Sequence, residues 1–123
     1  MEKKAYYKYM LIIGSIWNLA LAVPILIMSF FISPGLSILG LLYYQAFLWA
    51  VILFGIGYGV VGLNIDNNHA LIVLGVIGKI LVFLYYMVYF LLGILDISYV
   101  MIGTGDLIFA LLFIEFLINY KKL

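Results

Sequence analysis

The sequence predicts an all-α integral membrane protein with four transmembrane helices in an up-down bundle and both termini cytoplasmic. Hydrophobic residues make up 69% of the chain, charged residues make up 9%, and the mean hydropathy is +1.33. Soluble domains average about 45–50% apolar residues with glycine included, so this composition lies well outside their range. The 123 residues suffice for four crossings, because each crossing takes about 20 apolar residues. We expect a single four-helix membrane domain over residues 1–123.

Turn-forming and polar residues delimit the first two helices. The first apolar run covers Tyr9–Ile32 and meets Ser33-Pro34-Gly35, which is typical of a turn. The second run covers residues 39–63 and ends at the polar hexapeptide 64–69. These interruptions predict the first two helices at about 9–32 and 39–63.

A cleaved signal peptide is the alternative interpretation of the N-terminus. Lys3 and Lys4, the apolar stretch after them and the small residues of Ala20-Leu21-Ala22 resemble such a segment. The apolar run continues without a break through Val23–Ile32. This continuity favours an uncleaved first helix.

The third apolar run covers residues 70–94, and the fourth helix is expected at 105–120. Gly103-Thr104-Gly105 is typical of a loop before a helix, and Asp106 has a side chain preferred at the N-cap. Residues 97–102 would then form an apolar connector at the membrane edge. A start at Ile97 would give a full-length crossing but leave almost no turn after Asp96.

The lysines predict the orientation of the chain. Five of the six lie near its ends: Lys3, Lys4, Lys8, Lys121 and Lys122. Under the positive-inside rule both termini face the cytoplasm, and an even number of crossings agrees. The expected location is the cell (plasma) membrane.

The sixth lysine, Lys79, lies inside the third apolar run, where a cation is a candidate functional site. Two carboxylates of the fourth helix could pair with it. Asp106 and Glu115 are nine positions apart and so face opposite sides of that helix. Glu115 shares its face with Asn119, which favours a Lys79–Glu115 ion pair. The pair could be a structural clamp or a ligand or ion site. Alternatively, the Lys79 side chain could extend to the membrane interface without any partner.

Other polar residues extend this site by their depth in the predicted helices. Asn18 and Tyr58 fall in the same half of the membrane as Lys79, whereas Asp106 is expected near the outer surface. The candidate ligand or ion-pair residues are therefore Lys79, Glu115, Asn18, Tyr58 and Asn119, and the outer-side polar candidates are Asp106, Gln45 and Asp96.

Small residues predict where the helices approach each other. Gly55 and Gly59 form a G-x-x-x-G stripe on the second helix, and Gly14, Asn18 and Ala22 recur at four-residue spacing on the first. We interpret both stripes as seams within the bundle rather than as a dimer contact.

The sequence shows no motif for catalysis or for cofactor binding. There is one histidine, His69, and no cysteine, so no metal or haem site is expected. No nucleotide-binding or nucleophile-elbow motif is present, and nothing points to nucleic acid. These observations favour a non-enzymatic role without deciding the question.

In layout the chain resembles the DoxX-like proteins, which are four-helix membrane proteins linked in some members to quinone or redox partners. Gly75-x-x-Gly78-Lys79 is similar to a Gly-Lys pattern of that family, although here the pattern lies in the third helix rather than the first. The resemblance concerns layout only. It implies a four-helix membrane fold.

Two functions are consistent with these features. The first is a structural or accessory membrane protein that forms a homo-oligomer or a subunit of a larger membrane complex. The second is a small transporter or hydrophobic-ligand-binding protein that uses the intramembrane Lys, Glu and Asn residues. Clustered tyrosines in the outer half of the second and third helices could line a pocket for an apolar small molecule, or they could serve as packing and interface anchors. The lipid bilayer is the one partner that both functions require.

Overall fold

The computed structural model describes residues 2–32 and 35–120, and it is all-helical in these ranges. The helices are α1 (Glu2–Ser29), α2 (Ile38–Leu63), α3 (His69–Leu91) and α4 (Ile97–Asn119). Each of the four is long and apolar enough to cross a membrane. The prediction of an all-α fold with four helices of membrane-spanning length is therefore confirmed.

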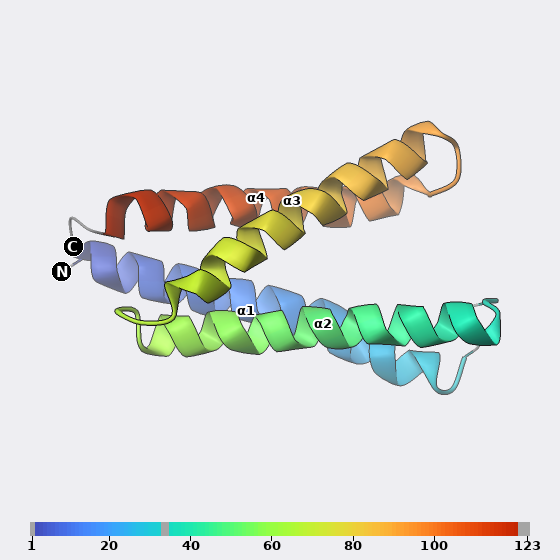
Figure 1. The fold of residues 1–123 in the computed structure, drawn as a ribbon, viewed down its shortest axis with the longest axis horizontal. Helices are drawn as coiled ribbons and strands as arrows, with labels where there is room; N and C mark the ends of the chain where they lie inside the picture. Colours follow the sequence, from blue (N-terminus) through green and yellow to red (C-terminus); the bar gives the residue numbers. More distant parts are fainter. Residues whose placement is uncertain (1, 33–34, 121–123) are drawn as a thin grey trace.

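The helices form two antiparallel hairpins, α1–α2 and α3–α4 (Figure 1). Packing within each hairpin is far more extensive than packing between the hairpins. The start of α1, the end of α4 and the loop 64–68 lie at one end of the molecule, here called the closed end. The α1–α2 and α3–α4 connections lie at the other end, here called the open end, where the two hairpins diverge.

The hydrophobic core explains this shape. A large cluster of buried side chains at the closed end draws on all four helices: Tyr7, Met10, Leu11, Tyr58, Val61, Ile72, Val76, Ala110, Phe113 and Phe116. A smaller cluster toward the open end draws only on α1 and α2: Ala22, Leu26, Leu48 and Ile52. The hairpins are thus held together by one shared core and separate beyond it.

The first helix begins and ends earlier than its apolar run predicts. It starts at Glu2 rather than Tyr9 because the tyrosine-rich first turns also pack, and Tyr7 is fully buried in the shared core. It ends at Ser29 rather than Ile32, because residues 30–32 continue as a turn whose N–H groups donate to the carbonyls of Ile27 and Met28. The predicted turn at Ser33 and Pro34 lies outside the described residues.

The third helix ends at Leu91, three residues before the predicted Ile94. Gly93 adopts φ +78°, its N–H donates to the carbonyl of Phe90, and the N–H of Ile94 donates to the carbonyl of Tyr89. This is the Schellman arrangement, in which a glycine with positive φ ends a helix. The α2 boundaries agree with the prediction to within one residue, with Ser37 as the N-cap.

The fourth helix is the main correction to the predicted layout. It begins at Ile97 instead of residue 105, so the supposed connector is helical and Asp106 lies inside the helix rather than at its cap. Gly103 and Gly105 serve close packing instead of a loop. A Cβ on Gly103 would lie 3.2 Å from the Tyr86 ring, and a Cβ on Gly105 would overlap the Trp17 ring.

The seam between α1 and α2 follows the predicted small-residue stripe. A Cβ added at Gly55 would lie 2.9 Å from Cβ of Asn18, and one added at Gly59 would lie 3.1 Å from Oγ of Ser15. The prediction that this stripe packs within the bundle is confirmed for these glycines. The close approach brings Asn18 directly against the backbone of α2.

A polar latch at the closed end joins the loop 64–68 to α1 and α4. The Tyr120 hydroxyl donates to Asp66, and the Lys4 ammonium lies 3.2 Å from the same carboxylate oxygen. His69 packs edge-on against Tyr120, with a ring-centroid distance of 4.2 Å. The hydrogen bond from Tyr120, followed by that from Lys4, lowers the pKa of Asp66 below its ordinary value of 3.8.

This latch is expected to weaken in acid. Because folding lowers the pKa of Asp66, its stabilising contribution is fully present above the unfolded pKa and is lost as the pH falls through the folded pKa. Thermal unfolding of wild type and Asp66→Asn should therefore differ at about pH 7 and converge by about pH 2. A difference that stays constant over this range would contradict the latch.

Candidate functional site

The only lysine within the apolar part of the four helices forms a buried ion pair with α4. Nζ of Lys79 in α3 lies 2.8 Å from Oδ1 of Asp106. Lys79 is 5% exposed, and the Asp106 side chain is 17% exposed. The predicted Lys79–Glu115 pair is therefore wrong, and the partner of the lysine is Asp106.

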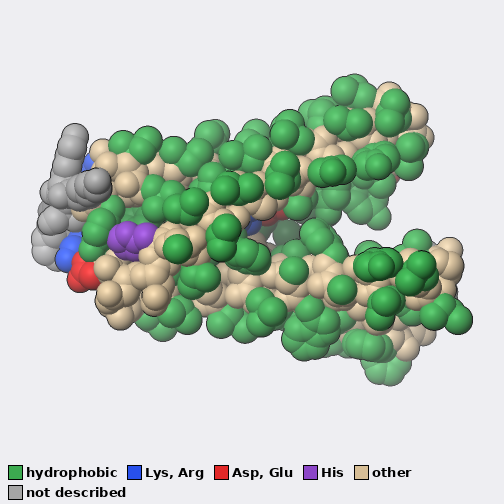
Figure 2. Space-filling model, viewed as in Figure 1, with side chains coloured by type: hydrophobic (Ala, Val, Ile, Leu, Met, Phe, Trp, Pro, Cys, Tyr) green, Lys and Arg blue, Asp and Glu red, His purple; other side chains and the backbone are tan. Residues whose placement is uncertain are grey.

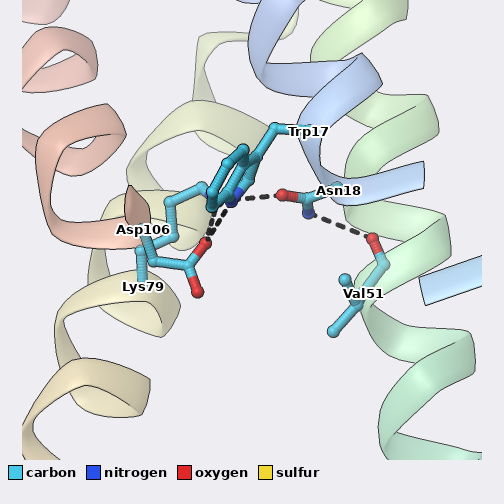
Figure 3. A network of polar contacts seen from close by, with 5 residues as sticks. All are labelled: Trp17, Asn18, Val51, Lys79 and Asp106. Atoms are coloured by element: carbon cyan, nitrogen blue, oxygen red, sulfur yellow. Dashed lines mark hydrogen bonds and ion pairs between the residues drawn. The ribbon is translucent and has the colours of Figure 1, made fainter. Parts of the chain in front are cut away.

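Helix α1 supplies two more members of this cluster. Lys79 also donates to Oδ1 of Asn18 at 2.9 Å, and the indole N–H of Trp17 donates to Oδ1 of Asp106 at 3.2 Å. The Asn18 amide then donates to the carbonyl of Val51 in α2 at 3.1 Å. Figure 3 shows these five residues, which connect all four helices through one continuous network. We call Trp17, Asn18, Lys79 and Asp106 the polar cluster.

Two aromatic rings close the cluster. Nζ of Lys79 lies 5.4 Å from the centroid of the Tyr58 ring and 5.8 Å from that of Phe109. Tyr58 is itself packed against Phe113 in the shared core. Rings at this distance stabilise an ammonium group through their π-electrons. The lysine is thus held by one carboxylate, one amide oxygen and two ring faces.

The earlier start of α4 explains the change of partner. With residues 97–104 in the helix, Asp106 moves away from the end of α4 and faces Lys79, while Glu115 points to the opposite side. Glu115 instead accepts a hydrogen bond from the Tyr7 hydroxyl at 3.3 Å. Asn119 donates to the backbone carbonyl of Glu115 and takes no part in the cluster.

The remaining predicted residues also lie apart from the cluster. Gln45 of α2 donates to Oγ of Ser29 in α1 at 3.0 Å, which ties the α1–α2 hairpin near the open end. Asp96 is the N-cap residue of α4 and accepts a hydrogen bond from Ser98. Of the eight candidate residues, the structure brings together Lys79, Asn18, Tyr58 and Asp106.

Trp17 is a member of the cluster that was not among the predicted residues, although its position in the sequence carries a signal. Trp17 lies well inside the first apolar run, and a tryptophan N–H removed from water usually finds an acceptor. The only acidic side chains in the apolar parts of the helices are Asp106 and Glu115. A buried indole and a buried lysine together indicate a carboxylate at their depth.

One side of Asp106 remains open. Its Oδ1 accepts from both Lys79 and Trp17, whereas Oδ2 accepts no hydrogen bond from any residue in the described part of the chain. Figure 3 shows Oδ2 directed away from Trp17 and Asn18, toward the open end. Figure 2 shows the molecule hollowed between the two hairpins on that side. The polar cluster thus forms the base of a cleft between the two hairpins, and we call it the cleft base.

The cluster is suited to binding rather than to metal chemistry. One lysine and one aspartate give it a net charge of zero, and all its named donors point inward. Within residues 2–32 and 35–120, no three His, Cys, Asp or Glu side chains lie close enough to hold a metal ion. Its available chemistry is hydrogen bonding through one carboxylate oxygen.

The fold and the site define a four-helix protein whose helices are of membrane-spanning length and whose interior holds a buried Lys–Asp pair. Comparisons with protein-family models, with curated proteins and with solved structures found no match to this chain.

Proposed function

We propose that this protein is a small membrane protein that binds a hydrophobic ligand in the cleft between its two hairpins. The observation that carries the proposal is Oδ2 of Asp106, an acceptor left open at the base of a cleft. Ligand sites are typically concave and mostly apolar, with a few polar groups that fix orientation. The polar cluster supplies those groups, and the apolar helices supply the walls.

The membrane placement belongs to the same proposal. The lysines near both chain ends favour cytoplasmic termini in the plasma membrane. The closed end then faces the cytoplasm, and the cleft opens toward the outer leaflet. A ligand would enter from the lipid phase or from the outer surface.

The test is to identify what co-purifies with the protein. Organic extraction of detergent-purified wild type, followed by mass spectrometry, should release a small amphiphile in near-stoichiometric amount. Asp106→Asn should release much less, because it removes the carboxylate at the base of the cleft. Asp96→Asn is the matched control, since Asp96 lies at the start of α4 outside the cluster and its carboxylate accepts a hydrogen bond only from Ser98 among the described residues, and it should retain the amphiphile. Equal yields from both variants would contradict the site.

A structural or accessory role is the second candidate, and one observation favours it. The polar network runs through Lys79, Asp106, Asn18 and Val51, so it links α3 and α4 to α1 and α2. In this role the network would hold the hairpins in register within a homo-oligomer or a larger membrane complex. It predicts no bound ligand and a loss of stability when the network is removed as a whole.

A further inference from the structure

Most hydrogen-bonding groups of the cleft base already have partners within the protein. The single N–H of the Trp17 ring donates to Asp106. The Asn18 amide oxygen accepts from Lys79, and its nitrogen donates to the backbone of α2. Lys79 directs two of its three N–H groups to oxygen atoms and lies beside two aromatic rings. Among the side-chain oxygen atoms of the cluster, Oδ2 of Asp106 is the one that accepts no hydrogen bond from the described part of the chain, and it faces the cleft.

Charge narrows the ligand further. The Lys79–Asp106 pair is neutral as a unit, and Oδ2 faces the ligand with lone pairs only. An anionic head group would be repelled by Oδ2. A cationic head group would leave one uncompensated charge in the apolar interior, which is costly. The favoured head group is thus a neutral hydrogen-bond donor.

Aromatic rings of α3 and α4 lie beyond Asp106 toward the open end. Tyr99 lies seven residues before Asp106, two turns nearer the open end on the same side of α4. It packs edge-to-face with Tyr86 of α3, with a centroid distance of 5.7 Å. Carbon chains and flat rings pack favourably on such aromatic side chains.

We infer that the ligand is a neutral, hydroxyl-bearing lipid whose hydroxyl donates to Oδ2 of Asp106 and whose apolar part lies along the cleft. The inference rests on the proposed ligand-binding function and deepens it. It separates donors such as alcohols from acceptor-only molecules of the same size, such as ethers and ketones.

Trp17 provides a reporter for the test. The chain has two tryptophans, and the other, Trp49, is half exposed and makes no hydrogen bond to the cluster. A Trp49→Phe variant in phosphatidylcholine nanodiscs is titrated with hexadecan-1-ol, with its methyl ether and with hexadecanoate, and the Trp17 emission is recorded. The alcohol should bind about tenfold or more tightly than the ether, because a hydrogen bond to a charged group is lost.

The same titration on Asp106→Asn in the Trp49→Phe background locates the contact. Lys79 and Trp17 are donors, so the amide oxygen should occupy the Oδ1 position and the amide NH₂ the Oδ2 position. Alcohol and ether should then bind equally, since each offers an oxygen acceptor. The comparison of probes on the parent variant needs no change at the site and so does not depend on Asp106→Asn folding.

Each outcome separates the two proposals. A preference for the alcohol that disappears in Asp106→Asn supports both. Equal binding of alcohol and ether, or tighter binding of hexadecanoate, overturns the hydroxyl assignment and leaves the ligand site standing. A Trp17 signal that none of the three probes changes overturns the assignment and the ligand site together.

Discussion

Lys79→Met is expected to lower the free energy of unfolding by about 3–5 kcal/mol, the cost of leaving a buried partner charge uncompensated. The loss is large because Asp106 would keep only the indole N–H of Trp17 in an apolar interior. Asp106→Asn should cost a similar amount, since Lys79 would lose its counter-charge and keep only neutral partners in an apolar interior. Equilibrium unfolding in mixed micelles, followed by circular dichroism, measures these losses.

Glu115→Gln is the matched control for the choice of partner. Glu115 is the other acidic side chain in the apolar part of α4, but its contact is a 3.3 Å hydrogen bond from Tyr7. Its loss should cost no more than about 1.5 kcal/mol, the upper end for an ordinary hydrogen bond. A loss from Glu115→Gln as large as that from Asp106→Asn would contradict the observed pairing.

The double variant Lys79→Met/Asp106→Asn distinguishes the two candidate functions. It leaves no buried charge, so its stability should return to within about 1 kcal/mol of wild type, because ion pairs in apolar interiors are often replaceable at little cost. A stable double variant that has lost its co-purifying amphiphile favours ligand binding. A double variant as unstable as the single ones favours a clamp that holds the hairpins.

The helices were predictable from the sequence because their signal is long and repetitive. The first three apolar runs are each at least as long as a crossing requires, and α2 was placed to within one residue. Helix ends that depend on a single residue were harder to predict from the sequence. The Gly93 turn lies inside an apolar run, so hydropathy alone places the end of α3 at Ile94 instead of Leu91.

The polar cluster was predictable only in part. The burial of Lys79 and the depth of Asn18 follow from their positions in apolar runs. The partner of Lys79 could not be predicted in the same way, because Gly103-Thr104-Gly105 is compatible with two structures. Its composition is typical of a loop, and its small residues are equally typical of a surface where apolar helices pack closely. Only the contacts of these glycines with the rings of Tyr86 and Trp17 show that the segment packs against other helices and is not a loop. The assignment of Asp106 depended on that choice.

The closed end and the open end of the bundle differ in how far the two hairpins contact each other. The closed end holds the shared core of all four helices and the latch at Asp66, so it supplies most of the contact between the hairpins. The open end leaves each hairpin to pack on its own. The polar cluster lies between the closed end and the open end, so a molecule at Oδ2 of Asp106 would touch both hairpins at once.

Substitution of Gly75 by alanine is expected to destabilise the protein, whereas the same change at Gly78 is not. A Cβ at Gly75 would overlap Tyr58, with its ring atoms Cε1 and Cζ only 2.5 and 2.7 Å away. Tyr58 cannot move easily, because it is 1% exposed and packs against Phe113 and Lys79. Overpacking of this kind costs about 1–3 kcal/mol.

Gly78 is the matched control because it lies in the middle of the same helix and nothing lies within 4 Å of its added Cβ. Both substitutions carry the same gain in helix propensity, at most about 1 kcal/mol, so the difference between the two variants isolates the contact with Tyr58. Equilibrium unfolding should place Gly78→Ala at or above wild type and Gly75→Ala below it. Equal stabilities would mean that Tyr58 does not pack against α3. A lower stability of Gly75→Ala that is rescued by Tyr58→Leu would tie the loss to the ring that covers Lys79.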